Sequence, residues 1–249
     1  MLIVSFDIAS KSLAMSIIDF DDNYLTQLNE ISTKFRVDIK NASAIDATTI
    51  ALDVVNQLAN VYDNIFNLRL IDVVDLIPGK KVKNTTSMLR STRLAGYLQQ
   101  VDKVIEQQVK IGYRGNEEIK IFLEYQMSAN FKSNFIFSQI MGHFSNKDYE
   151  FKSTLEITKE KFKRKYDVVV IKPSLKNKLN LDKDKDYSYF MGKYAKKQSA
   201  NKAHAKANLL YWLKQHDKEN IISGIKKGNI DDVADSVTQA LAWIIYAWE

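Results

Sequence analysis

Runs of apolar residues divide the chain into short strands and longer helices. Residues 2–8 and 12–20 are almost continuously apolar and lie close together in the chain, which predicts a buried pair of antiparallel strands. Farther along, apolar residues recur either in short β-branched runs or at spacings of three and four. We therefore expect further strands over 24–33, 70–77, 119–124 and 166–171, and helices over 43–66, 87–109, 130–144, 200–216 and 231–248.

The order of these elements predicts the fold class. Three strands come first, helices and strands then alternate, and two helices close the chain, which is typical of an α/β protein with a mixed sheet. The 249 residues are enough for one large domain with a substantial core. We expect a single domain over 1–249, in which residues 174–199, rich in Lys, Asp, Asn and Tyr, form a basic loop insertion.

Composition excludes several kinds of chemistry. The chain has no cysteine, so disulfides, zinc–thiolate sites, iron–sulfur clusters and cysteine nucleophiles are excluded. No apolar run approaches the ~20 residues that a membrane span needs, and we expect no targeting signal. The chain is rich in Lys, Asn and Ile, which is typical of an AT-rich genome such as that of a large DNA virus. For a viral protein we expect the host cytoplasm as its location, ahead of the mitochondrion.

Charge is unevenly distributed along the chain. The net charge is +6, but residues 159–227 alone hold 19 Lys and Arg against 7 Asp and Glu. A strongly basic segment favours a polyanionic partner, of which nucleic acid is the simplest. A solvated lysine-rich surface explains the same composition equally well.

Four carboxylates stand where apolar residues would be expected. Asp7 interrupts the first strand, Glu124 ends the strand 119–124, and Asp232 and Asp235 lie three apart near the start of the last helix. A carboxylate inside a buried strand costs several kcal/mol unless it is paired or bound to a cation. Taken singly, each could be a helix cap or an exposed residue, but together they predict one acidic site.

Oxygen ligands of this kind select hard cations, so we expect Mg²⁺, with Mn²⁺ as a substitute. Two such ions about 4 Å apart can activate a water molecule and stabilise a leaving oxygen in an in-line displacement at phosphorus. Next to a basic half of the chain, this chemistry indicates phosphodiester hydrolysis.

Three motifs carry a resemblance to a known family. The segments F-D-I-A-S-K at 6–11, L-E-Y-Q at 123–126 and D-D-V-A-D-S at 231–236 resemble the RuvC-type Holliday junction resolvases, most closely their poxvirus and fungal mitochondrial branch. The resemblance implies an RNase H-like five-stranded mixed sheet with helices on both faces. It also implies a homodimeric, magnesium-dependent endodeoxyribonuclease of DNA recombination and repair, which makes paired cuts in four-way junctions with Asp7, Glu124, Asp232 and Asp235 as metal ligands.

The resemblance extends to basic residues. Ser199 to Lys202 is similar to a helix start in the bacterial enzymes, where a lysine lies near the scissile phosphate, so Lys202 is a candidate catalytic residue or an ordinary helix-start lysine. Two departures are Ala9, where the family usually has glycine, and the lack of a clear match for the bacterial stacking aromatic, for which Tyr125 and Met127 are neighbours. The candidate DNA-binding residues are Lys80, Lys81, Lys83, Lys176, Lys178, Lys196, Lys197, Lys202 and Lys206, with Arg90 and Arg93 beside the first group.

Other interpretations remain open. The same metal chemistry serves other RNase H-like nucleases and transposases, and a non-catalytic junction-binding protein on this fold would keep the basic residues. An actin-like ATPase also starts a strand with an aspartate, but no glycine-rich nucleotide segment is evident. The three histidines show no ligand spacing, and we expect them to be packing or surface residues. The candidate dimer contacts, equally compatible with a core position, are Tyr97, Phe131, Phe135, Phe137 and Phe144.

Overall fold

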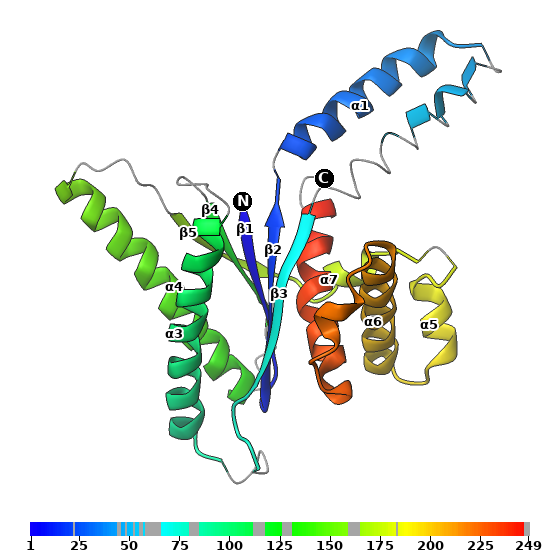
Figure 1. The fold of residues 1–249 in the computed structure, drawn as a ribbon. Coiled ribbons are helices and arrows are strands. Elements are labelled where there is room, and N and C mark those ends of the chain that lie inside the picture. Colours follow the sequence, from blue (N-terminus) through cyan, green and yellow to red (C-terminus); the bar gives the residue numbers. More distant parts are fainter. Residues whose placement is uncertain are drawn as a thin grey trace.

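A computed structural model describes residues 1–21, 23–43, 46–47, 49–51, 53–54, 57, 66–79, 85–111, 118–125, 131–158, 165–182 and 184–246. Its centre is a five-stranded sheet in the order β3-β2-β1-β4-β5, which Figure 1 shows between two groups of helices. The strands are β1 (Leu2–Ile8), β2 (Ser12–Phe20), β3 (Phe66–Asp75), β4 (Glu118–Glu124) and β5 (Lys165–Ile171).

Strand directions identify the fold. β1, β2 and β3 pair in antiparallel fashion, whereas β4 pairs parallel to β1 and β5 parallel to β4. This order and these directions are those of an RNase H-like sheet, so the predicted mixed five-stranded α/β sheet is confirmed. Because Phe6 of β1 is level with Leu123 of β4, the next residue on each strand, Asp7 and Glu124, reaches the same edge of the sheet.

Helices cover both faces of the sheet, as the resemblance implied. On one face, α3 (Ser87–Ile111) and α4 (Phe131–Thr158) bury apolar side chains against β1 and β4. On the other, α6 (Lys197–Gln215) and α7 (Ile230–Tyr246) do the same, and α5 (Tyr187–Lys193) packs against α6. α7 is the most deeply buried of these, since Val233, Val237 and Leu241 are all at most 1% exposed. No helix in the described part of the chain combines the length and apolar character that crossing a membrane requires.

The prediction of a strand over 24–33 is wrong. The segment lies in α1 (Asn23–Asn41), which projects from the end of β2 away from the rest of the fold (Figure 1). Ile31, Phe35 and Ile39, all half-buried, recur at a spacing of four, which is the helical period and not the alternation of a strand. The Asp21 side chain accepts a hydrogen bond from the Asn23 backbone N–H at the start of this helix.

The other elements follow the predictions with shifted ends. β3 begins at Phe66, four residues before the predicted start, and α4 continues to Thr158. The described part of 43–66 includes helical residues at 46–47, 49–51, 53–54 and 57. Short 3-10 helices, η3 (Glu219–Ile222) and η4 (Lys227–Asn229), precede α7.

The segment 174–199, expected as a basic loop insertion, is partly helical. A 3-10 helix, η2 (Leu175–Lys178), and α5 lie within it, and α6 begins at Lys197. Asp186 caps α5 by accepting a hydrogen bond of 2.9 Å from the Tyr189 N–H. Leu179 and Phe190 are buried and hold the segment on the body of the protein. In a lysine-rich segment, so few apolar residues did not predict this packing.

Candidate active site

A pocket at the carboxyl ends of β1 and β4 gathers the four predicted carboxylates. Its volume is about 610 Å³, and its lining includes side chains from β1, β4, η2, α6 and α7. Asp7, Glu124, Asp232 and Asp235 all line it, together with Lys176 and Lys202. The structure therefore brings together residues that lie more than two hundred positions apart in the chain.

The packing of α7 on β1 explains why two of these carboxylates meet. Gln239, one turn after Asp235, donates hydrogen bonds to Ser5 Oγ (2.6 Å) and to the Phe6 backbone oxygen (2.8 Å). Gln239 and Ser5 are buried, so these bonds fix the helix against the strand at the residues next to Asp7. The i,i+4 relation between Asp235 and Gln239 then directs Asp235 toward the same strand.

The turn between β1 and β2 closes the pocket at its rim. The Ala9 N–H donates to the Ser12 backbone oxygen at 3.0 Å, and Ser12 Oγ donates to Asp232 Oδ2 at 2.9 Å. Among the described residues other than glycine, only Asp217 has a positive φ, so alanine at position 9 needs no left-handed backbone. The departure from the family's glycine is therefore accommodated by the turn.

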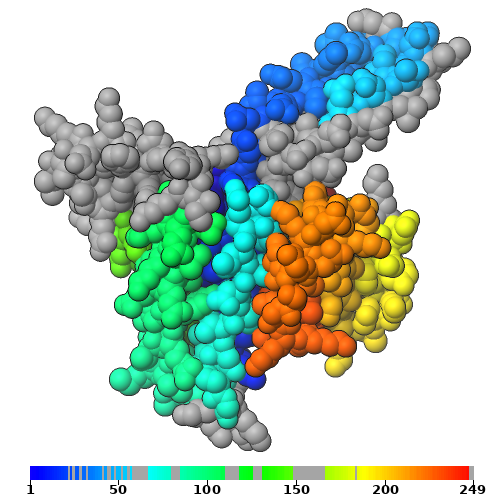
Figure 2. Space-filling view, viewed as in Figure 1, coloured from blue at the N-terminus to red at the C-terminus, as the bar shows by residue number. Residues whose placement is uncertain are grey.

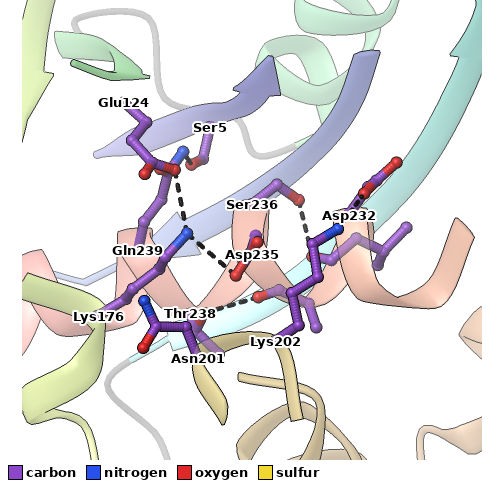
Figure 3. A network of polar contacts seen from close by, with 12 residues as sticks. Ser5, Glu124, Lys176, Asn201, Lys202, Asp232, Asp235, Ser236, Thr238 and Gln239 are labelled. Carbon is purple, nitrogen blue, oxygen red and sulfur yellow. Dashed lines mark hydrogen bonds and ion pairs between the residues drawn. The ribbon is translucent and has the colours of Figure 1, made fainter. Parts of the chain in front are cut away.

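Lys176 lies in the middle of the carboxylates. Its Nζ is 3.1 Å from Glu124 Oε2 and 3.0 Å from Asp235 Oδ1, and the whole residue is only 7% exposed. Figure 3 shows the ammonium group between these two side chains. η2 supplies this lysine, a few residues after the end of β5, so a fourth element joins β1, β4 and α7 at the site.

Burial and mutual repulsion alter the protonation of these groups. Burial raises the pKa of Asp7 well above its ordinary value, and the neighbouring charge of Asp235 raises it further. Burial likewise raises the pKa of Asp235, although Lys176 acts in the opposite direction. Burial alone would lower the pKa of Lys176, but Asp235 and Glu124 outweigh it and the pKa is raised, so the lysine stays charged.

Lys202 faces the pocket from α6. Its Nζ is 3.3 Å from Asp232 Oδ1, and its side chain remains 40% exposed. Burial lowers its pKa, Asp232 raises it, and the net pKa is raised. On the same helix face, Lys206 pairs with Asp231 at 3.3 Å, next to the carboxylates. Lys202 is therefore a charged group with access to both the carboxylates and the solvent.

The donor set suits a divalent cation, but its present arrangement does not form a coordination shell. Among the described residues, no three His, Asp or Glu side chains are arranged to hold a metal ion. The Lys176 ammonium group lies between Glu124 and Asp235, within ion-pair distance of both. Burial, followed by the charge of Asp235, keeps the pKa of Asp7 raised although Lys176 acts in the opposite direction.

Several predicted DNA-binding residues do not line the pocket. Lys178 Nζ lies over the Tyr246 ring, 5.8 Å from its centre. Arg90 is buried and donates to Ser10 and Thr85 oxygens, so the prediction that it contacts phosphate is wrong. Lys196 and Lys197 are exposed at the start of α6. Lys80, Lys81, Lys83 and Met127 lie outside the described residues.

Two of the aromatic residues considered for a dimer contact belong to the core. Tyr97 and Phe144 are buried, and the Phe144 ring packs against Phe6 and Tyr166. Phe131, at the start of α4, is 74% exposed, and Phe135 and Phe137 are half-buried. As expected, the histidines make packing and surface contacts: His143 pairs with Asp102, and His204 lies against Tyr187 and Phe190.

Sequence reasoning missed three polar residues of the site. Ser12 and Gln239 act through hydrogen bonds across the fold, and neither residue type marks such a role in a single sequence. Asn201 lines the pocket, and its Oδ1 accepts a hydrogen bond of 2.6 Å from the Tyr187 hydroxyl. Its position between Ser199 and Lys202, within the motif already noted, is the one signal that could have indicated it.

Comparisons with known proteins give structural likenesses at low identity. No family model and no curated protein matches the sequence. The fowlpox virus Holliday junction resolvase is similar with a TM-score of 0.46 and 14% identity, over 98% of this chain and 99% of that one. The resolvase in a complex of fowlpox virus resolvase with Holliday junction DNA is similar with the same TM-score of 0.46 and the same 14% identity, over 100% of both chains. T. thermophilus RuvC in complex with a Holliday junction substrate is similar with a TM-score of 0.43 and 10% identity, over 100% of this chain and 96% of that one.

Proposed function

We propose that this protein is a divalent-metal-dependent DNA endonuclease that cuts four-way junctions. The observation that carries the proposal is the convergence of Asp7, Glu124, Asp232 and Asp235 on one pocket of an RNase H-like sheet, with Lys202 at its open side. These carboxylates come from the ends of two parallel strands and one helix, and each belongs to a motif of the RuvC-type resolvases. The choice of the four-way junction as substrate follows from those motifs.

The roles of the residues follow from their positions. Asp7, Glu124, Asp232 and Asp235 would hold Mg²⁺ or Mn²⁺, and a metal bound there supplies a Lewis acid that activates water and stabilises a leaving oxygen. Ser12 fixes the orientation of Asp232 through its hydrogen bond. Lys202, half exposed and charged, is available to a phosphate oxygen of the substrate. Lys196 and Lys197 extend the positive surface along the start of α6.

The proposal includes a homodimer. A four-way junction has two-fold symmetry, and paired cuts need two sites in fixed register, which a C2 dimer provides. Phe131 is the exposed member of the aromatic residues at the start of α4 and is the candidate contact. Analytical ultracentrifugation of the wild type and of Phe131→Ser tests this part, and a wild-type monomer on junction DNA would contradict it.

The experiment that tests the function is a substrate panel. Purified protein is incubated with a four-way junction, a flap, an RNA–DNA hybrid and a linear duplex, each with Mg²⁺ and with EDTA. We expect symmetric nicking of the junction with Mg²⁺ only. Asp7→Asn should abolish cleavage and retain junction binding, because it removes a carboxylate without altering the basic surface. Preferred cleavage of the hybrid or the linear duplex would instead indicate another RNase H-like nuclease.

One observation favours a second candidate, a non-catalytic junction-binding protein on the same fold. Lys176 neutralises Glu124 and Asp235 directly, and the described residues hold no assembled metal shell. Tight junction binding in EDTA, with no nicking after either Mg²⁺ or Mn²⁺ is added, would support this candidate and contradict the first.

A further inference from the structure

Lys176 makes two buried ion pairs with carboxylates from different parts of the fold. Glu124 ends β4 and Asp235 lies in the second turn of α7, and Lys176 Nζ is within 3.1 Å of an oxygen of each. The side chains are 8%, 14% and 9% exposed for Lys176, Glu124 and Asp235, so little solvent screens the contacts. The ammonium group therefore occupies the place of a cation between two carboxylates.

A divalent ion cannot bind the same two oxygens, Glu124 Oε2 and Asp235 Oδ1, while the ammonium group remains between them. Two cations at ion-pair distance from the same oxygens would repel each other strongly in a poorly solvated pocket. The described residues present no set of three carboxylates arranged for a metal in any other way. Metal binding through these two oxygens thus requires that Lys176 leaves them.

We propose that Lys176 is an internal cation that exchanges with the divalent metal. It holds Glu124 and Asp235 together in the metal-free protein, and it releases both when the metal binds. This inference rests on the proposed function, since it concerns the same pocket. It adds that the affinity for metal is set by competition with a residue of the chain itself.

The first test measures Mn²⁺ affinity without any nucleic acid. Free Mn²⁺ is followed by electron paramagnetic resonance during titration of the full chain, for the wild type and for Lys176→Met. Removing the competitor should tighten binding by at least about tenfold, which corresponds to only ~1.4 kcal/mol. Lys202→Met is the control for loss of a positive charge near the pocket, and it should tighten binding clearly less, because Lys202 contacts a single carboxylate and is partly solvated. Lys185→Met, whose partner is Asp182, should change nothing.

The second test needs no variant and remains valid if Lys176→Met does not fold. The wild-type chain is acetylated briefly with an amine-reactive reagent, with and without saturating Mg²⁺, and each lysine is quantified by mass spectrometry. Lys176 should be protected in the metal-free protein and become reactive with Mg²⁺, whereas Lys185 should react equally in both conditions.

The outcomes separate this inference from the proposed function. Junction cleavage together with unchanged Mn²⁺ affinity in Lys176→Met, or with Lys176 equally protected in both conditions, would overturn the exchange and leave the nuclease. Weaker Mn²⁺ binding in Lys176→Met would also overturn the exchange, because removing a competing cation cannot weaken metal binding. If neither protein binds Mn²⁺ and no junction is cut, both proposals are wrong.

Discussion

Ser12 Oγ donates a hydrogen bond of 2.9 Å to Asp232 Oδ2, and so joins the start of β2 to the first turn of α7. The other oxygen of Asp232 lies 3.3 Å from Lys202 Nζ on α6. Three elements therefore determine the orientation of one carboxylate. The orientation of the Asp232 side chain therefore depends on its contacts with Ser12 and Lys202.

We expect Ser12→Ala to impair the site more than the fold. Loss of one partly buried hydrogen bond should lower the free energy of unfolding by about 1 kcal/mol, measured by urea denaturation. The freed Asp232 should weaken Mn²⁺ binding, and Ser12→Thr, which keeps the hydroxyl, should restore much of it. Unchanged Mn²⁺ affinity in Ser12→Ala would contradict the positioning role.

Arg90 should be important for stability and not for DNA binding. It is 1% exposed and donates to the Ser10 backbone oxygen and to both oxygens of Thr85, so it ties α3 to the turn beside the pocket. Arg90→Met should lower the free energy of unfolding by about 3 kcal/mol, because it leaves buried acceptors unpaired. Arg93→Met, on the exposed side of the same helix, should change it by less than about 0.5 kcal/mol. Equal effects of the two substitutions would contradict this assignment.

His204 should make stability depend on pH. Burial lowers the pKa of His204 from its ordinary 6.5, although Asp186 acts in the opposite direction. The unfolded chain therefore binds a proton more readily than the folded chain, so the free energy of unfolding should fall as the pH drops below about 6.5. Urea denaturation between pH 7.5 and pH 5 measures this.

The matched variant for that measurement is His204→Gln, which keeps a polar side chain but does not titrate. Its free energy of unfolding should be lower at pH 7.5 and should change less over the same range. A wild-type curve with the same slope as that of His204→Gln would show that His204 is not the group responsible.

Lys196 and Lys197 should contribute to junction binding through phosphate contacts. Each contact adds about 0.9 to the slope of log affinity against log salt, so the double alanine variant should reduce that slope by about 2. Lys214→Ala is the control, because it lies on the same helix about 25 Å farther along its axis. Fluorescence anisotropy at several salt concentrations gives the slope, and an unchanged slope in the double variant would exclude both residues from the interface.

The fold was predictable where hydrophobic periodicity is strong. The strands 2–8 and 119–124 are nearly continuous apolar segments, apolar residues recur at helical spacing in the final helix, and the structure confirms all three elements. Residues 24–33 were misassigned because they combine β-branched residues with a helical period, and the helix at 23–41 continues beyond the window considered. Local composition outweighed spacing in that prediction.

The carboxylates were predictable because each interrupts an apolar pattern. Their convergence depended on the order of β1 and β4 in the sheet, which the motif resemblance supplied and periodicity alone did not. The sequence indicated Lys176 as a candidate DNA-binding residue, but it did not predict the position of this lysine between Glu124 and Asp235, because the segment was expected to be a basic loop insertion. The roles of Ser12 and Gln239 were not predicted either, because a single long-range hydrogen bond produces no pattern in the sequence.

Phe20 pairs with Phe66 at the end of the sheet where α1 departs, while Asp7 and Glu124 lie at the other end. The helix α1 leaves the sheet at the Phe20 end and stands clear of the body of the protein (Figure 2). A label or a tether attached to α1 would therefore lie at the end of the sheet opposite Asp7 and Glu124.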